Sequence, residues 1–341
     1  MHREFDPLEI VAAARELLVR LAPLAEPVEG IVMCSQMHGL VLTTERGEPR
    51  SHVTTWQDQR VLELAGEDGA TWFDHLTRQI TAEEVRQLGN ELRPGLPIGV
   101  LYWLRMHGQF PDPDLYLASL PDFLFSHLCQ TPPMIEPSNA MAHGVLNLET
   151  MSWHEAVLDR LGLAGLRWPI ICPSGTIVGR WCWQGRAVPC YAPVGDYQCA
   201  LAGALLQPDE LSLNISTGSQ VSRLRPTAEF GDYQTRPFFD GQFLATITHI
   251  PAGRALNALL RLFTELAEAQ GVTLNDPWGY VAQAAARVGS TRLRANIAFF
   301  TSSCGDRGAL TEMREEEMTI GHIFRAAFEN MTDNYWASAL R

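Results

Sequence analysis

Segments with the pattern of strands alternate with segments of helical periodicity along the whole chain, and this alternation limits the possible folds more than any other feature. Short apolar runs bounded by turn residues predict strands at 30–34 and 40–44. Apolar residues at helical spacing predict helices over 7–25 and 253–267. Because strands that alternate with helices are typical of α/β proteins, the sequence predicts the α/β class.

The same criteria predict most of the remaining chain. Further strands are expected at 53–56, 176–179, 187–192, 211–215, 221–225, 243–250 and 296–301. Further helices are expected at 82–88, 99–106, 121–129, 153–161, 195–206, 277–288 and 318–340. The proline-rich stretch 130–137 is predicted to be a loop. A length of 341 residues allows two domains of ordinary size.

The composition excludes several kinds of chemistry. All 26 basic residues are arginine, because the sequence contains no lysine. The chain therefore has no P-loop lysine for nucleotide phosphates, and no lysine to form a Schiff base or to act as a general base. With 39 acidic residues the formal net charge is −13. This charge argues against nucleic acid as a partner, since nucleic-acid binding rests on clustered basic residues.

The sequence shows no sign of a membrane segment or of a disulfide framework. Its first residues lack the basic and apolar regions of a secretory signal, and no run approaches the roughly 20 apolar residues of a membrane span. The seven cysteines include no pair at C-x-x-C spacing, and the histidines form no metal-ligand pattern. We therefore expect no metal site among these residues, no membrane partner and a cytoplasmic location.

Two candidate functional sites lie in the C-terminal half of the chain. Asp196 follows Gly195 at a predicted helix start, where backbone N–H groups and the helix dipole stabilise a carboxylate. The alternative is that Asp196 is only an N-cap. Ser216-Thr217-Gly218 is a hydroxyl-rich turn after a predicted strand, and its amides and hydroxyls suit phosphate oxygens. The alternative is an ordinary hairpin turn in which glycine supplies a positive φ.

Two further candidates lie in the N-terminal half. The turn Ser35-Gln36-Met37-His38-Gly39 between two predicted strands carries an amide and an imidazole, which suit sugar hydroxyls. The alternative is that His38 is a structural histidine. Trp56-Gln57-Asp58-Gln59-Arg60 places an aromatic ring beside polar groups at a predicted strand end. This combination suits a carbohydrate, and the alternative is a surface cluster of salt bridges.

Taken in order, these motifs resemble the FGGY family of carbohydrate kinases. The segments 35–39 and 56–60 resemble the ketose kinases of that family, and Gly195-Asp196-Tyr197-Gln198 resembles its G-D-x-Q motif. Asn214-Ile215-Ser216-Thr217-Gly218 followed by Arg236-Pro237-Phe238-Phe239 is most similar to the branch that acts on sedoheptulose. The order and spacing of the motifs extend the resemblance over nearly the whole chain.

The resemblance implies an actin-like α/β fold of two ribonuclease-H-like domains with a cleft between them. Residues 1–194 would form the sugar-binding domain and residues 195–341 the nucleotide-binding domain. The implied reaction transfers the γ-phosphoryl group of ATP, with Mg²⁺, to a hydroxyl of a ketose of the sedoheptulose or xylulose type, and Asp196 is the implied general base. The residues implied for sugar binding are Gln36, Met37, His38, Trp56, Asp58, Arg60 and Gln198. Those implied for ATP binding are Ser216, Thr217, Gly218, Gly253 and Asn257.

The sequence departs from the family pattern in two ways. Glycerol kinases carry Arg and Glu at the positions of Met37 and His38, and tyrosine at the position of Gly95, so these residues point toward a longer ketose. The family also has an Asp-x-Gly-Thr hairpin near its start and a Gly-Gly adenine loop near its end, and this sequence contains neither. We therefore expect a fold that is incomplete at both termini, and weak or no turnover by these residues alone.

Two other functions stay open at this point. The first is a non-catalytic sugar-binding relative that lacks the phosphate hairpin. Asp196 argues against it, since a pure binding protein has no need of a base. The second is a hydrolase, which would need two carboxylates facing one bond, such as Asp58 and Asp196. The sequence does not fix the identity of the ketose or the oligomeric state.

Overall fold

The computed structural model describes residues 2–25, 27–67 and 69–341, and the chain divides into two compact units. The first unit consists of residues 1–206, 225–230 and 235–244, and the second of residues 207–224, 231–234 and 245–341. Packing therefore groups the residues just after 195 with the first unit. The predicted division into a sugar-binding and a nucleotide-binding domain at residues 194 and 195 stays a prediction.

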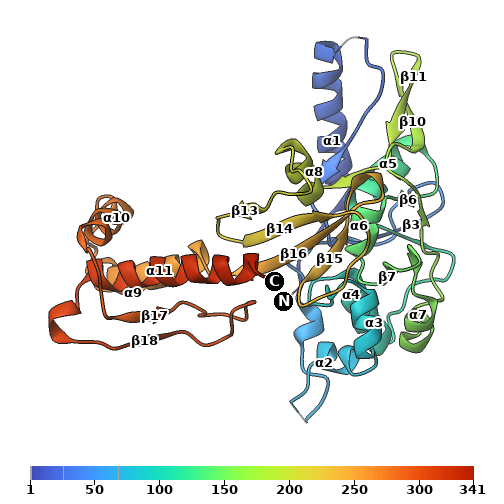
Figure 1. The fold of residues 1–341 in the computed structure, drawn as a ribbon. Coiled ribbons are helices and arrows are strands. Elements are labelled where there is room, and N and C mark those ends of the chain that lie inside the picture. The colour runs from blue at the N-terminus through green and yellow to red at the C-terminus, as the bar shows by residue number, and fades with distance from the viewer. Residues whose placement is uncertain (1, 26, 68) are drawn as a thin grey trace. The chain divides into compact units, whose positions relative to one another are not determined.

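The first unit is built from short strands and helices that alternate (Figure 1). Its strands are β1 (Glu4–Phe5), β2 (Cys34–Ser35), β3 (Val41–Thr43), β4 (Val53–Thr54), β5 (Tyr116–Ala118), β6 (Met134–Ile135), β7 (Leu146–Asn147), β8 (Ser152–Trp153), β9 (Ile170–Ile171), β10 (Ile177–Trp183), β11 (Arg186–Tyr191) and β12 (Val194–Gly195). Its helices are α1 (Pro7–Leu21), α2 (Trp72–Thr77), α3 (Ala82–Gln87), α4 (Pro97–Met106), α5 (Leu120–Cys129), α6 (Pro137–Met141), α7 (Glu155–Leu161) and α8 (Asp196–Gly203).

Local sequence signals explain where several of these helices begin. Helices α2 and α3 start with capping boxes, in which the side chain of Thr71 or Thr81 accepts the backbone N–H three residues on. Helix α5 starts after Ser119, whose hydroxyl accepts the N–H of Asp122. Apolar faces of α2, α4 and α7 then meet β5 in the main core of this unit, which includes the fully buried Leu76 and Leu101.

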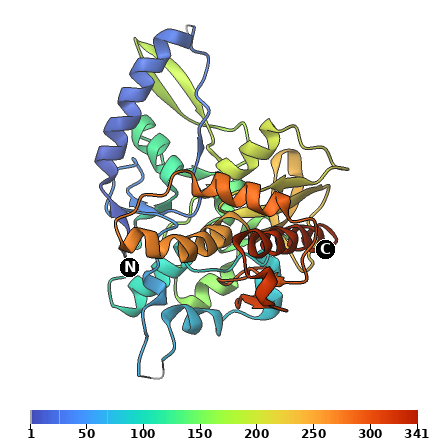
Figure 2. The ribbon, with the colours of Figure 1, turned by 90° about the vertical axis from the view of Figure 1, so that its left-hand side faces the viewer.

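The second unit contains a larger sheet and three longer helices. Its elements are β13 (Ser212–Asn214), β14 (Ser219–Arg225), β15 (Gln234–Pro237), β16 (Phe243–Ile250), α9 (Gly253–Ala269), α10 (Pro277–Arg287), β17 (Arg294–Asn296), β18 (Ala309–Thr311) and α11 (Ile320–Ala339). The four-stranded sheet has the order β13-β14-β16-β15, and some residues of its last three strands belong to the first unit. Helix α11 packs on α10 and β17 (Figures 1 and 2).

The core of the second unit lies among α9, α10 and α11. Leu256 and Leu259 of α9, Val281 of α10 and Phe324 of α11 are buried together. The apolar residues of α9 recur every three or four positions, so that one face of this helix is buried and the other carries polar side chains. Burying one such face against neighbouring helices supplies most of the stability of a helix of this length.

Most predicted elements are present, but the strand predicted at 30–34 is reduced to Cys34–Ser35, and two further predictions are wrong. The stretch 130–137 contains β6, because Met134–Ile135 pairs in parallel with Ile170–Ile171, a partner that is distant in the sequence. The strand predicted at 296–301 instead covers Arg294–Asn296 and pairs with β18. Asn296 ends it, since its side-chain oxygen accepts the N–H of Ala298 at 3.0 Å.

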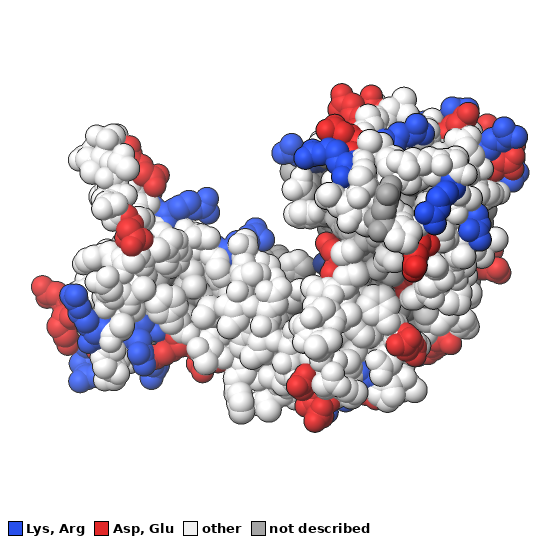
Figure 3. Space-filling view, turned by 90° about the horizontal axis from the view of Figure 1, so that it is seen from above, with Lys and Arg blue, Asp and Glu red and all other residues white. Residues whose placement is uncertain are grey.

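Three features concern the kinds of partner considered above: the distribution of surface charge, the helices, and the clustering of metal-binding side chains. On the face shown in Figure 3, acidic and basic side chains are interspersed within each unit. None of the helices in the part of the chain that the structure describes has both the length and the apolar character needed to cross a membrane. Among the same residues, no group of three or more His, Cys, Asp and Glu side chains is placed to hold a metal ion.

Candidate functional site

A parallel pair of two-residue strands brings two of the predicted motifs to the same place. Strand β12 pairs with β2, with Val194 opposite Cys34 and Gly195 opposite Ser35. Parallel strands run in the same direction, so the residues that follow them leave at the same edge. Segment 36–38 follows β2 and Asp196 follows β12. The carboxyl edge of parallel strands is where ligands bind in open α/β sheets.

Two side chains of helix α6 hold strand β12 in this position. The hydroxyl of Ser138 accepts the backbone N–H of Gly195 at 2.9 Å, and the side-chain amide of Asn139 donates to the carbonyl of Pro193 at 3.0 Å. The Ser138 hydroxyl in turn donates to the buried carboxylate of Glu136. Buried hydrogen bonds of this kind fix a backbone position. The backbone just before Asp196 is therefore held by helix α6 as well as by its pairing with β2.

Asp196 is the first residue of helix α8 and not its N-cap. The N-cap is Gly195, which makes no side-chain capping bond. Burial by the surrounding protein raises the pKa of the Asp196 carboxyl above its ordinary value, although its side chain retains contact with solvent. Backbone N–H groups of Tyr197 and Asp196 and attraction to Arg236 act in the opposite direction. A raised pKa makes the carboxylate a better proton acceptor.

His38 has an unusual backbone conformation and a charged neighbour. Its φ of 68° lies in the left-handed region, which few residues other than glycine adopt. Arg93 Nη2 lies 2.7 Å from His38 Nε2. Because a guanidinium only donates, the imidazole must accept at Nε2 and is neutral. Burial, together with the positive charges of Arg93 and Arg236, holds the pKa of His38 well below its usual range.

Glu91 and Arg236 complete this cluster, and sequence reasoning missed both. Arg236 Nε donates to Glu91 Oε1 at 3.0 Å, and its Nη2 donates to the same oxygen. The Arg236 guanidinium also lies over the ring of Tyr197, 5.2 Å from its centroid. Glu91 lies 3.8 Å from Arg93 through its other oxygen. Arg236 stands in one of the motifs that resemble the family, and this motif was the signal that could have identified it. Nothing in the sequence indicates that it pairs with Glu91.

Met37 and Gly195 pack closely behind the same turn. Met37 is buried in a cluster with Ile135 and Met141. A Cβ atom at Gly195 would lie 2.7 Å from the sulfur of Met37, which is too close for any side chain without a shift. The methionine therefore anchors segment 36–38 against strand β12, which precedes Asp196, while Gln36 is half-buried beside it.

Asp58 and Arg60 are paired with each other in the interior. Arg60 Nε and Nη2 donate to the two oxygens of Asp58 at 2.9 and 2.8 Å, and the backbone N–H of Arg3 adds a further bond at 2.8 Å. Both side chains are buried. Burial alone would raise the pKa of Asp58, but the hydrogen bonds from Arg60 and Arg3 outweigh it, so the pKa is lowered. The carboxylate is thus ionised and paired with Arg60, which argues against a part in a hydrolase pair, and the sugar contact predicted for Asp58 and Arg60 stays a prediction.

Trp56 and Gly95 lie together at the start of this segment. The Trp56 side chain is 52% exposed. Gly95 has φ +85°, and a Cβ atom there would lie 2.5 Å from the carbonyl oxygen of Trp56. The backbone therefore requires glycine at this position for a reason independent of substrate size.

Gln198 is fully buried in the first turn of α8. Its side-chain amide donates to the carbonyl of Pro237 at 3.1 Å. Its Oε1 atom has no hydrogen-bond partner among the residues that the structure describes. The described geometry gives Gln198 a part in positioning α8, and its contact with a substrate stays a prediction.

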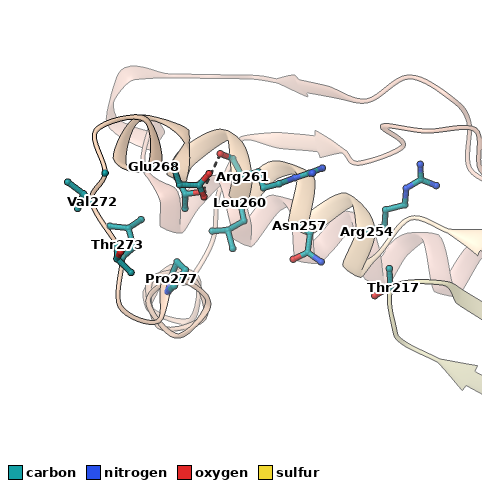
Figure 4. A pocket seen from close by; sticks show the side chains of 12 residues that line it. Thr217, Arg254, Asn257, Leu260, Arg261, Glu268, Val272, Thr273 and Pro277 are labelled. Atoms are coloured by element: carbon teal, nitrogen blue, oxygen red, sulfur yellow. Dashed lines mark hydrogen bonds between the residues drawn. The ribbon is translucent and has the colours of Figure 1, made fainter.

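A pocket in the second unit contains two of the residues predicted for ATP. It has a volume of about 720 Å³ and lies along helix α9 and the chain that follows it (Figure 4). Thr217 and Asn257 both line it, together with Arg254 and Arg261. Positions 254, 257 and 261 are three and four residues apart, which places them on one helix face. The volume lies within the usual range for small-molecule sites.

The turn Ser216–Gly218 meets the beginning of helix α9. The backbone N–H of Gly253 donates to the carbonyl of Ser216 at 3.3 Å. Ser219 closes the turn, since its hydroxyl donates to the same carbonyl at 2.8 Å. Gly218 is not among the glycines with positive φ, so the turn does not form for the reason first considered. The hydroxyl of Thr217 thus lies where α9 begins, and the N-terminus of a helix favours anions.

Comparison with known proteins agrees with this architecture. Residues 3–192 match the N-terminal domain of the FGGY family of carbohydrate kinases. The sedoheptulokinase of Homo sapiens is 24% identical over 97% of this chain and 74% of its own length. A ligand-bound xylulose kinase from Lactobacillus acidophilus superposes with a TM-score of 0.79 at 19% identity, over 99% of this chain and 69% of that one. Plasmodium falciparum glycerol kinase with ADP gives a TM-score of 0.78 at 15% identity, over 99% and 70%.

Proposed function

This chain belongs to the FGGY family of carbohydrate kinases, and from that premise we propose that it transfers the γ-phosphoryl group of ATP to a hydroxyl of a ketose of the sedoheptulose or xylulose type. The actin-like fold predicted from the resemblance is confirmed by the structural neighbours. The observation that carries the proposal is the parallel pairing of β2 with β12, which brings the segment with His38 to the same edge as Asp196.

Asp196 is the residue we assign as general base. Phosphoryl transfer needs a positioned nucleophile, stabilisation of charge on the transferred group and one group to accept the hydroxyl proton. The Asp196 carboxylate is accessible, it lies at a helix N-terminus, and burial raises its pKa. These properties suit a base that takes the proton from the attacking sugar hydroxyl.

The sugar would lie on the first unit against the segment Gln36-Met37-His38 and the exposed ring of Trp56. The burial of Met37 holds the segment 36–38 in place, and the Arg93 guanidinium bonded to His38 makes this part of the unit polar. Asp58 and Arg60 contribute by holding the segment after β4, since their charges neutralise each other in the interior. Gln198 contributes by fixing the start of α8.

ATP would lie on the second unit in the pocket along α9. Thr217 and the start of α9 would meet phosphate oxygens, with Ser216, Gly218 and Gly253 shaping the backbone there. Arg254 and Arg261 supply positive charge in a chain without lysine. Asn257 would contact the rest of the nucleotide. Mg²⁺ would accompany the ATP phosphates, where it neutralises charge.

The test is a coupled assay of ADP release with ATP and a panel of ketoses, with glycerol for comparison. We expect phosphorylation of a five- or seven-carbon ketose and little turnover of glycerol. A protein that binds a ketose in calorimetry but releases no ADP would be a non-catalytic sugar-binding relative. A protein that neither binds nor phosphorylates a ketose would contradict the proposal.

Replacing Asn257 by leucine should weaken nucleotide binding. One lost hydrogen bond to a neutral group, at about 1 kcal/mol, corresponds to a KM for ATP that rises roughly 5- to 10-fold. The KM for the sugar should not change. Glu265→Gln is the control, because Glu265 is exposed on the same helix and does not line the pocket. An unchanged KM for ATP in Asn257→Leu would show that the nucleotide does not bind against Asn257.

A further inference from the structure

Arg93 has more hydrogen-bond donors than its neighbours use. Its Nη2 donates to His38 Nε2 at 2.7 Å and lies 3.8 Å from Glu91 Oε2. A guanidinium has five N–H donors and no acceptor. The Arg93 side chain keeps 31% of its surface exposed. A ligand that offers oxygen acceptors can therefore reach the remaining donors.

His38 contacts Arg93 through one ring nitrogen. Nε2 accepts a hydrogen bond from the Arg93 guanidinium at 2.7 Å. The left-handed backbone at residue 38 turns the chain so that the ring meets the guanidinium. His38 is thus placed to hold the guanidinium of Arg93 beside the segment 36–38.

Glu91 and Arg236 connect Arg93 to the proposed base. Glu91 lies between the two arginines and accepts two hydrogen bonds from Arg236. Arg236 in turn attracts the carboxylate of Asp196 and lies over Tyr197. Glu91 is thus hydrogen-bonded to Arg236 and attracts Arg93, so the Arg93 guanidinium belongs to the same charged cluster that acts on Asp196.

We propose that Arg93 is a specificity-determining residue that donates hydrogen bonds to an oxygen of the bound ketose, and that His38 and Glu91 are positioning residues that hold its guanidinium. The inference rests on the proposed function and assigns a contact to that same site. A polyhydroxy ketone fits, because its carbonyl and hydroxyl oxygens all accept hydrogen bonds and carry no charge that Asp196 would repel.

The first test is Arg93→Gln. A lost hydrogen bond from a charged group should raise the KM for the ketose about 10- to 100-fold. The value of kcat should fall less, and the KM for ATP should stay unchanged. Arg50→Gln is the matched control, because Arg50 is an exposed arginine of the same unit that pairs with Glu48. A folded Arg93→Gln protein with an unchanged KM for the ketose would overturn the proposal.

A double-mutant cycle separates the two possible sugar contacts. His38→Asn keeps a side-chain oxygen acceptor and a residue that tolerates positive φ, so it should raise the KM for the ketose less than His38→Leu. In the Arg93→Gln background, His38→Leu should add little, because His38 acts through Arg93. Fully additive effects would mean that His38 contacts the sugar itself, and this would overturn the assignment.

A spectroscopic measurement tests the cluster without any turnover. The charged and titratable groups that face His38 are Arg93, Arg236 and His143. Removing the Arg93 charge should raise the pKa of His38 toward its ordinary value, as followed by NMR of the imidazole. A pKa that does not move would show that the contact is absent and would overturn the proposal. If the wild-type protein phosphorylates no ketose, the proposed function fails, and ketose affinity by calorimetry in wild type and Arg93→Gln then decides on Arg93.

Discussion

Asp196→Asn should abolish most phosphoryl transfer while it leaves the fold and sugar binding intact. Asparagine has nearly the same shape but cannot accept the hydroxyl proton, and a positioned general base contributes about 10²- to 10⁴-fold. We therefore expect kcat to fall by that factor with little change in the KM for the ketose or in ketose affinity measured by calorimetry. The side chain is exposed, and asparagine keeps an oxygen that can accept the backbone N–H groups at the start of α8, so the free energy of unfolding should hardly change.

The pH dependence of the wild-type enzyme supplies a second measurement on the same residue. The base must be ionised, so the rate should be lost as the pH falls through the pKa of Asp196. Burial raises that pKa, hence the acidic limb should lie above the ordinary value for aspartate, about 3.9. Asp159→Asn, at an exposed position of α7, serves as the control and should retain full activity. Retained turnover in Asp196→Asn would remove this residue from the base role.

Asp58→Asn should cost stability rather than catalytic chemistry. The substitution leaves the buried guanidinium of Arg60 with Glu4 as its other acidic partner, and Glu4 is partly exposed. Breaking a buried ion pair in this way costs about 3–5 kcal/mol of unfolding free energy. Urea denaturation followed by circular dichroism would measure the loss. A variant as stable as wild type, but with weakened ketose binding, would instead return Asp58 to the sugar contact predicted from the family motif.

The stability difference between wild type and Asp58→Asn should depend on pH in one direction. The folded-state pKa of Asp58 is lowered. Its contribution is therefore fully present above the unfolded-state pKa of about 3.9, and it is lost as the pH falls through the folded-state value. The two proteins should differ most at neutral pH and converge in strong acid. Asp114→Asn provides a comparison, because Asp114 is an exposed partner of Arg167.

Local sequence signals predicted several elements correctly. Strand β16 covers Phe243–Ile250 as predicted from its apolar run, and helix α9 begins at Gly253 as predicted from its periodicity. Some of the elements that sequence reasoning missed depend on distant partners, whereas helix α2 was missed although a capping box at Thr71 marks its start. Strand β6 forms only because β9 pairs with it, and a two-residue strand has no pattern of its own. A strand was predicted at 30–34, but the strand in the structure is only Cys34–Ser35. Before it, Ile31 forms an isolated β-bridge with Cys190.

The candidate site also contains residues that local motifs predicted and contacts between distant segments that they did not predict. Thr217 and Asn257, chosen from motifs, share one pocket in the structure, and the helical spacing of Arg254 and Arg261 could have added these two residues. The cluster of Glu91, Arg93 and Arg236 could not have been predicted, because a charge pair across distant segments leaves no local pattern. For the same reason, the sequence did not predict the extent to which Asp58 and Arg60 are buried against each other, and their sugar contact stays a prediction.

The pairing of β2 with β12 also determines when the site can form. Its two strands come from residues near the beginning and near the end of the first unit's longest segment. On the ribosome, the segment with His38 emerges early, but it has no strand beside it until Gly195 has been synthesised. Contacts between residues so distant in sequence form late and slowly. A nascent chain that pauses before residue 194 would therefore fold its helices without assembling the edge on which the proposed chemistry depends.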